Sequence, residues 1–405
     1  MCLVLAKRTH CQPLSSRRNP CGSSSQALIG LERCTRFGSA ADKRKRMHAM
    51  DTRNIIVIGA SAGGFAVLRQ LAADLPPNLP AALFIVWHMP PDAQGLLSQV
   101  LNRAHTLPAA DAVDGEAIVL GRIYVAPPDH HLLLEPGRVR VTKGPKEHRF
   151  RPAVDPLFRS AALTYGPRVV GVVLSGALDD GTAGLQVIKR RGGTAVVQDP
   201  LDAEVPSMPH NAMRAVAVDY AVPGADLAAL FVRLSQENVT ALPEIAMDDD
   251  DKTRIEILIA AAENALEAGV MGLGSPTPYT CPDCHGVLLA LRDGEQVRFR
   301  CHTGHAFSAD SLLAAVAATT EDQLWSAVRS LDESILLLNH LGDHLAETQQ
   351  TSLAAMYYQH AHAVGTQSQL VRQALSQHQL LSRERLQQLA DTLQDHEGTP
   401  DDQFS

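Results

Sequence analysis

No stretch of this 405-residue chain is apolar for long enough to cross a membrane. A membrane-spanning helix needs roughly 18 or more consecutive apolar residues, and no uninterrupted apolar run in the sequence approaches that length. The sequence therefore predicts a soluble protein with no direct membrane insertion.

Cysteine is missing from the middle of the chain. The seven cysteines fall into two groups, and none lies between Ser61 and Lys252. The groups are Cys2, Cys11, Cys21 and Cys34, and Cys281, Cys284 and Cys301. An odd total with clustered spacing argues against a disulfide framework and predicts a reducing compartment, the cytoplasm, with a metal site. Any covalent nucleophile in the cysteine-free region must be a hydroxyl.

Positive charge is scarce outside the first 50 residues. Residues 1–50 hold ten Lys/Arg against two Asp/Glu, whereas the rest holds 26 against 42. An acidic body argues against nucleic acid as the main partner. Residues 1–50 have no hydrophobic period and contain the basic run Lys43–Arg46, so we expect disorder there. There are three alternatives for this segment: a transit peptide, a nucleic-acid-binding arm, or residues outside the native protein, whose true start would then be Met47 or Met50.

Near-continuous apolar runs alternate with helical patterns between residues 51 and 235. The runs are Ile55–Ile58, Ala82–Trp87, Val169–Leu174 and Thr194–Val197. Helical patterns follow the first three, at Gly64–Ala73, Gln94–Arg103 and Ala183–Lys189. This alternation predicts an α/β fold with a doubly wound, mostly parallel, Rossmann-like sheet. Three shorter runs predict a small antiparallel patch: Ile123–Val125, His131–Leu134 and Val139–Val141.

Ser61 lies at the centre of a Gly-x-Ser-x-Gly turn, between Gly59 and Gly63. Such a strand-to-helix turn lifts the serine hydroxyl clear of the backbone, and glycine fits where a Cβ would clash. The N-terminus of the next helix can stabilise negative charge at the same point. A dinucleotide-binding Gly-x-Gly-x-x-Gly is not met, because Ser61 occupies the second glycine position. A structural turn remains the alternative.

Two further polar residues follow predicted strands. His88 comes directly after Ala82–Trp87, and Asp180 follows Val169–Leu174 in the sequence Asp179-Asp180-Gly181. In open α/β sheets ligands bind at the carboxyl ends of the strands. A serine, a histidine and an aspartate at one edge form the components of a nucleophilic triad. Each alone has an ordinary structural explanation, such as a cap or a turn.

Six separated motifs occur in order along residues 53–234. They are Ile58–Gly64, Trp87–Pro91, Tyr124–His130, Arg151–Asp155, Leu174–Gly181 and Ser207–Pro209. Together they resemble the catalytic domain of the chemotaxis-receptor protein-glutamate methylesterases. The resemblance implies a triad of Ser61, His88 and Asp180 that hydrolyses glutamate γ-methyl esters on receptor helices, giving glutamate and methanol. Glutamine deamidation is a related activity, and catalysis needs no cofactor.

The resemblance also implies substrate-side residues. Backbone N–H groups beside the nucleophile and before the aspartate, at Ala62 and Ala177, would bind the oxyanion. Many relatives have methionine where Ala177 stands. Arg151 and Asp155 would line the substrate side, with a structural ion pair or helix cap as the alternative. Many members carry an N-terminal phospho-receiver domain, which residues 1–50 cannot form, so we expect regulation by another route.

Cys281 and Cys284 are separated by two residues, and Cys301 and His305 follow after a further sixteen. Three thiolates and one imidazole at this spacing predict a tetrahedral structural zinc site in a zinc-ribbon-like module. His302 and His285 are alternative fourth ligands, and a redox Cys-x-x-Cys pair is the alternative function. Similar knuckles trail relatives of the family, which implies a regulatory or docking role.

The remaining segments complete the predicted domain organisation. Residues 51–235 form the catalytic domain, 236–278 a linker with a short helix, 279–310 the zinc-knuckle module, 311–395 a helical region and 396–405 an acidic tail. The linker contains the acidic run Asp248–Asp251, a helical pattern over Arg254–Leu266 and loop-like residues at Gly272–Pro278. In the helical region a short heptad seam runs from Leu324 to Leu338 and favours a helical hairpin over an intermolecular coiled coil.

Two function classes remain open from the sequence. The first is an active methylesterase whose partners are methyl-accepting chemotaxis receptors. The second is a non-catalytic scaffold of a chemosensory system that binds a receptor or a receptor methyltransferase. The complete Ser61, His88 and Asp180 set favours the esterase, because a scaffold has no need of it.

Overall fold

The computed structural model describes residues 52–91, 93, 95–239, 247–293 and 296–378. The predictions for residues 1–50 and for the acidic tail lie outside these residues. Within them, no helix has the length and apolar character that crossing a bilayer requires.

A seven-stranded sheet forms the centre of the first half of the chain. Its order is β3-β4-β2-β1-β7-β8-β9, and all neighbouring strands are parallel. The strands are β1 Ile55–Ala60, β2 Ala82–Trp87, β3 Ala109–Asp111, β4 Ile123–Val125, β7 Val169–Val173, β8 Thr194–Gln198 and β9 Tyr220–Val222. β1 lies between β2 and β7, and all three are buried except Trp87, which is half-buried. Buried β-branched runs of this kind are expected for central parallel strands.

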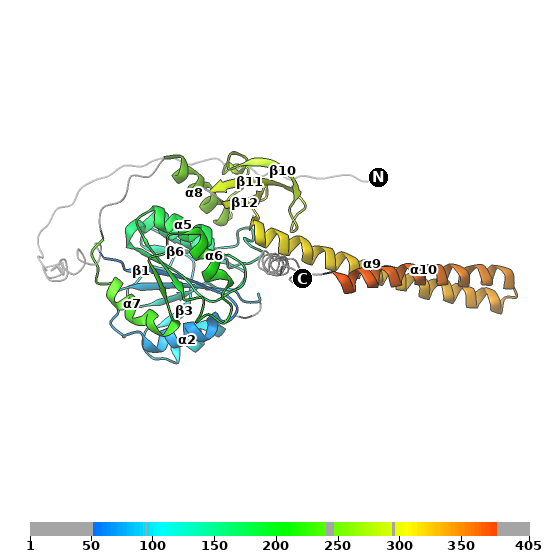
Figure 1. Cartoon of the computed structure of the whole chain (residues 1–405), viewed down its shortest axis with the longest axis horizontal. Helices are drawn as coiled ribbons and strands as arrows, with labels where there is room; N and C mark the ends of the chain where they lie inside the picture. The colour runs from blue at the N-terminus through cyan, green and yellow to red at the C-terminus, as the bar shows by residue number, and fades with distance from the viewer. Residues whose placement is uncertain (1–51, 92, 94, 240–246, 294–295, 379–405) are drawn as a thin grey trace, which may run out of the picture. The chain divides into compact units, whose positions relative to one another are not determined.

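Helices cover both faces of the sheet, so the predicted doubly wound architecture is confirmed. One face is packed against α2 Gly64–Asp74, α3 Leu96–Asn102 and α7 Leu227–Leu234. The other face is packed against α4 Val154–Tyr165, α5 Thr182–Arg190 and α6 Ser207–Ala215. Figure 1 shows α2 and α7 on the opposite side of the sheet from α5 and α6. Short 3-10 turns occur at Gly166–Arg168 and Gly224–Asp226.

The predicted antiparallel patch is partly wrong. β5 His131–Glu135 and β6 Arg138–Thr142 do form an antiparallel hairpin. Ile123–Val125, however, is β4 of the main sheet, parallel to both β2 and β3. A three-residue apolar run has the same pattern in either setting, so its partners cannot be read from it.

The second half of the chain begins with α8 Met247–Ala260. This helix starts earlier than the predicted Arg254 and contains the acidic run that we expected in a linker. Asp250 is paired with Arg191 at the end of α5, which places an acidic side chain of the helix against the first half. A 3-10 turn follows at Val270–Gly272.

A four-stranded antiparallel sheet follows α8, in the order β10-β11-β12-β13. Its strands are β10 Ser275–Thr280, β11 Val287–Asp293, β12 Gln296–Cys301 and β13 Ala306–Ser308. β11 and β12 pair as neighbouring antiparallel strands, from Leu288 opposite Cys301 to Asp293 opposite Gln296. The region predicted as a loop contains β10, because its prolines lie on an edge strand where a missing N–H is tolerated.

The last described elements are two long helices, α9 Ala309–Glu347 and α10 Thr351–Gln377. They form an antiparallel hairpin, since Asp332 of α9 bonds Ser368 and Arg372 of α10, and Asp343 bonds Tyr358. Ser308 caps α9 in a reciprocal capping box with Ser311. This agrees with the interpretation of the heptad seam as part of a helical hairpin.

Candidate functional site

Ser61 lies in the turn between β1 and α2, at the carboxyl edge of the sheet. Its N–H donates to the carbonyl of Ser175 over 3.0 Å, and its own carbonyl accepts from Trp87 Nε1 over 3.1 Å. Gly63 has φ of +76°, and a Cβ at that position would lie 2.5 Å from Ser175 Oγ. The turn therefore requires glycine there. These contacts hold the half-buried serine directly above the central strand.

His88 directly follows β2, and its backbone N–H donates to the carbonyl of Ala60 over 3.1 Å. Its Nδ1 lies 3.1 Å from Ser61 Oγ, and its Nε2 lies 2.8 Å from Asp180 Oδ2. A carboxylate can only accept, so Nε2 carries the proton and Nδ1 accepts from the serine hydroxyl. The arrangement is able to remove the hydroxyl proton of Ser61.

Asp180 follows β7 and is almost completely buried. Its carboxylate also accepts from the N–H groups of Val154 and Asp155, over 2.8 and 3.1 Å, in the first turn of α4. Burial alone would raise the pKa of this carboxyl, but the hydrogen bond to His88 and the nearby positive charge of His148 lower it. The N-terminus of α4 further favours the ionised form.

Ala62 and Ala177 are both exposed beside the serine. Across the part of the chain that the structure describes, no protein acceptor takes a hydrogen bond from either N–H. The turn before Asp180 is fixed by Leu178, whose φ is +63° and whose carbonyl accepts from Asn211 Nδ2 of α6 over 2.9 Å. Fixed N–H groups without a protein acceptor can bind a negatively charged oxygen.

Arg151 and Asp155 differ in what they can contact. Arg151 bonds Asp129 over 2.6 Å and the carbonyl of Gly144 over 2.8 Å. Asp155 is only 1% exposed, and one of its oxygens accepts from the Gly184 N–H over 2.7 Å. This agrees with the alternative interpretation of Asp155 as a structural carboxylate.

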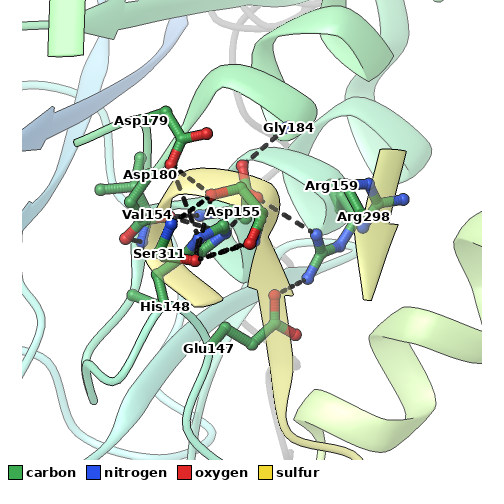
Figure 2. Close-up of polar contacts among 12 residues, drawn as sticks. Glu147, His148, Val154, Asp155, Arg159, Asp179, Asp180, Gly184, Arg298 and Ser311 are labelled. Atoms are coloured by element: carbon green, nitrogen blue, oxygen red, sulfur yellow. Dashed lines mark hydrogen bonds and ion pairs between the residues drawn. The ribbon is translucent and has the colours of Figure 1, made fainter. Parts of the chain in front are cut away.

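Sequence reasoning missed two residues of the loop between β6 and α4. The ring of Phe150 is stacked on the imidazole of His88, with 3.8 Å between ring centroids and 9° between planes. His148 is buried beside Asp155 and Asp180 (Figure 2). The loop carries neither a glycine motif nor a hydrophobic period. The only available signal was two basic residues and an aromatic one just before the Arg151–Asp155 motif.

A second group of side chains gathers at the β-sheet of the C-terminal half. The sulfur and nitrogen atoms of Cys281, Cys284, Cys301 and His305 all lie within 4.8 Å of one another. Cys284 Sγ lies 3.6 Å from Cys301 Sγ, which lies 3.6 Å from His305 Nδ1. Ligands of tetrahedral zinc bound at 2.0–2.3 Å are separated by about 3.5–3.8 Å. The donor set therefore fits zinc, with His305 bound through Nδ1, and His285 and His302 are not in the group.

Hydrogen bonds within this cluster shift the pKa values of its side chains. A hydrogen bond from Cys281 is the main cause that lowers the pKa of the Cys301 thiol to about 3. The hydrogen bond to Cys301 in turn raises the pKa of His305 to about 9. The lowered pKa of Cys301 favours the thiolate, which is the form that binds a metal, and a metal bound at His305 would have to displace the proton on Nδ1.

Comparison with known proteins covers the first of these two sites. Residues 56–231 match the family model described as CheB methylesterase. Over 185 residues the chain is 39% identical to a Leptospira interrogans protein named for protein-glutamate methylesterase and protein-glutamine glutaminase activity. That alignment covers 45% of this chain and 96% of the Leptospira protein. The chain belongs to the CheB methylesterase family. As a member of this family it is a carboxylic ester hydrolase.

Other relatives match the same segment. A Methanosarcina mazei protein-glutamate methylesterase/protein-glutamine glutaminase is 36% identical over 179 residues, which is 42% of this chain and 49% of that protein. The crystal structure of the Thermotoga maritima CheB methylesterase catalytic domain is 34% identical, with 45% of this chain and 98% of that one covered and a TM-score of 0.43. The matched segment contains Ser61, His88 and Asp180 but not the cysteine cluster.

Proposed function

We propose that this CheB-family chain removes γ-methyl esters from glutamate side chains of methyl-accepting chemotaxis receptors, and that Ser61, His88 and Asp180 are its catalytic triad. The observation that carries the proposal is the unbroken set of hydrogen bonds from Ser61 Oγ through His88 to Asp180, at the carboxyl edge of three adjacent strands. The relatives named for the same activity supply the substrate class.

The geometry supports a two-step acyl transfer. His88 Nδ1 takes the proton of Ser61 as Oγ attacks the ester carbonyl carbon, and Asp180 stabilises the imidazolium. The N–H groups of Ala62 and Ala177 bind the oxyanion. When the C–O bond breaks, His88 gives its proton to the departing methanol. Water, deprotonated by His88, then attacks the acyl-enzyme and releases glutamate and free Ser61. A glutamine amide in place of the ester would release ammonia by the same steps, and neither reaction needs a cofactor.

Arg151 is the remaining candidate for substrate binding. Its side chain is 16% exposed and its guanidinium is already paired with Asp129, so we assign it the role of orienting acidic substrate residues with its remaining N–H groups. We place the reaction in the cytoplasm, because free thiols in a metal-ligand arrangement require a reducing compartment. The receptor methyltransferase, which makes the substrate, is a further partner on this proposal.

The cysteine cluster has a structural role in this proposal. Four protein ligands would fill a tetrahedral zinc ion and leave no open position for substrate or water. Cys281 and Cys284 lie between β10 and β11, Cys301 ends β12 and His305 precedes β13, so one ion would join the two connections of the sheet. A redox role for Cys281 and Cys284 is less favoured, because Cys301 and His305 share their site.

The decisive experiment is methanol release from a methylated receptor by the full chain and by Ser61→Ala. Loss of release with unchanged circular dichroism and melting temperature is expected for Ser61→Ala. Ser235→Ala is the matched control, since it removes another hydroxyl from the same half, buried and bonded to the Val232 carbonyl. Release that persists in Ser61→Ala would overturn the triad and favour a non-catalytic scaffold.

A further inference from the structure

His148 lies buried beneath the proposed triad, with 4% of its side chain exposed. Its Nε2 is 3.1 Å from Asp155 Oδ2, and its Nδ1 is 3.1 Å from Ser311 Oγ in the first turn of α9. The backbone N–H of Asp155 donates to Asp180. His148 is therefore bonded to the residue whose backbone N–H holds the Asp180 carboxylate, as Figure 2 shows.

Three carboxylates surround this imidazole. Besides Asp155, Asp179 Oδ1 lies 3.9 Å from its Nδ1, and Asp180 Oδ1 lies 3.9 Å from its Nε2. Burial disfavours the charged imidazole, but the hydrogen bond to Asp155 and the neighbouring carboxylates raise the pKa of His148 to about 9. Charges act strongly on one another when their side chains are buried. At neutral pH His148 is therefore a cation that offsets the repulsion between Asp180 and its two acidic neighbours.

The C-terminal half holds this imidazole in place. The backbone N–H of His148 donates to the carbonyl of Ala306 in β13 over 2.8 Å. Ser308 Oγ donates to Asp179 Oδ1 over 2.7 Å, and Ser311 Oγ lies against His148 Nδ1. Both serines are at the start of α9, so the end of the sheet and the first helical turn contact His148 and one of its carboxylate neighbours, Asp179.

The same loop also carries the ring that covers His88. Reciprocal backbone bonds between Glu147 and Phe150, of 3.2 and 2.8 Å, close the loop around His148 and Arg149. His148 and Arg149 have φ values of +52° and +71°, a conformation that non-glycine residues adopt only when surrounding contacts enforce it. Glu147 is anchored by Arg159 and, from β12, by Arg300. Contacts from the C-terminal half thus fix a loop that touches both His88 and the neighbourhood of Asp180.

We infer that His148 is a positioning residue for the Ser61–His88–Asp180 triad, held by Ala306 and Ser311, so that ester hydrolysis depends on the C-terminal half of the chain. The inference rests on the proposed triad. Its physical basis is that a nucleophile–base pair works only when oriented within a fraction of an ångström, and that a preorganised charge stabilises the transition state without later rearrangement.

The first test is His148→Gln in the full chain. Glutamine keeps an N–H for Asp155 but removes the positive charge. We expect kcat for methanol release to fall about tenfold, the scale of losing one oriented interaction, with KM unchanged because the buried ring touches no substrate. Adding Asp155→Asn removes one of the repelling negative charges and should restore most of kcat. A wild-type kcat in His148→Gln, or no restoration in the double variant, would overturn the inference.

The second test addresses the C-terminal contact. Ser311→Ala removes the hydroxyl against Nδ1, and we expect kcat to fall severalfold. Ser368→Ala is the matched control, because its buried hydroxyl donates to Asp332 within the helical hairpin of α9 and α10. Equal kcat values for both variants would contradict the inference that ester hydrolysis depends on the C-terminal half. Circular dichroism at 222 nm verifies that α9 is intact in Ser311→Ala.

Labelling of Ser61 by a fluorophosphonate separates this inference from the proposed substrate. Ser61 Oγ forms a bond to phosphorus as fluoride leaves and His88 takes the proton, so the rate reports the triad without any receptor. Slower labelling in His148→Gln than in the wild type supports positioning. Equal rates would overturn the positioning role while the triad stands. Absence of labelling in the wild type would overturn the triad and, with it, the inference.

Discussion

The ring of Phe150 lies flat on the imidazole of His88, 3.8 Å away between centroids and nearly parallel to it. His88 also bonds Ser61 and Asp180 at its two nitrogens, so its edge and its face are both fixed. A base held on two nitrogens and one face has little freedom to rotate away from the serine. The stack therefore serves the geometry of the site as well as its packing.

Replacing Phe150 by alanine should lower kcat about tenfold, because ring stacking of this kind is worth roughly 0.5–1.5 kcal/mol beyond area burial and its loss frees the imidazole. Phe150→Tyr keeps the ring and should retain most activity. The measurement is the rate of methanol release at saturating receptor. If the alanine variant matched the tyrosine variant, the stack would have no part in orienting His88.

Gly176 should tolerate no side chain. A Cβ there would lie 2.8 Å from Ser61 Cβ and 2.0 Å from Met208 Sδ. Gly176→Ala should therefore displace Ser61, reduce hydrolysis at least about tenfold, and cost about 1–3 kcal/mol of unfolding free energy through overpacking. Gly272→Ala is the control, since a Cβ at that position would have no atom within 4 Å. Wild-type hydrolysis in Gly176→Ala would contradict this close approach.

Zinc should copurify with the protein at about one ion per chain, because three cysteines and one histidine complete a tetrahedron. His305→Gln should lose most of the metal and melt at lower temperature. His302→Gln, which changes a neighbouring histidine outside the cluster, should keep the wild-type metal content and melting temperature. The zinc content is measured by elemental analysis of protein that was freshly purified without a chelator. Protein free of metal would contradict the zinc proposal.

Arg300 and Arg372 should differ strongly in their contribution to stability. Arg300 has a fully buried side chain that bonds Glu147 and Glu256, whereas Arg372 is half exposed and pairs with Asp332. Arg300→Met leaves two buried carboxylates short of a partner and should cost about 3–5 kcal/mol. Arg372→Met should cost under about 1 kcal/mol. Urea unfolding of the two variants makes the comparison, and similar losses would contradict it.

Stability should also fall as the solution becomes alkaline. The folded-state pKa of His148, about 9, exceeds its ordinary value of 6.5. Its stabilising contribution is therefore complete below about pH 6.5 and is lost as the pH rises through 9, with a magnitude of about 3 kcal/mol. The informative quantity is the difference in unfolding free energy between wild type and His148→Gln, measured with urea at pH 6.5 and 9.5, because this difference removes the titration of the groups that the two proteins share. A difference that does not shrink with pH would contradict the charged imidazole.

The sequence predicted the central sheet and the meeting of Ser61, His88 and Asp180, because each residue follows a long buried strand and such strand ends share one edge. It could not predict His148, whose partner Ser311 lies 163 positions away in another element. The short strand β4 was misassigned for a related reason. Three apolar residues carry no information about which neighbours they pair with, and tertiary contacts decide it.

Helix α9 is a single element of 39 residues that starts at the Asp179 and His148 contacts. At 1.5 Å per residue it is about 58 Å long. Its far end, at the turn into α10, therefore lies a full helix length away from the first turn, which contacts Asp179 and His148. A tilt of about 10° moves that far end by about 10 Å and the first turn hardly at all. Large displacements of the far end of the hairpin would therefore move the residues beside the proposed triad by only small distances.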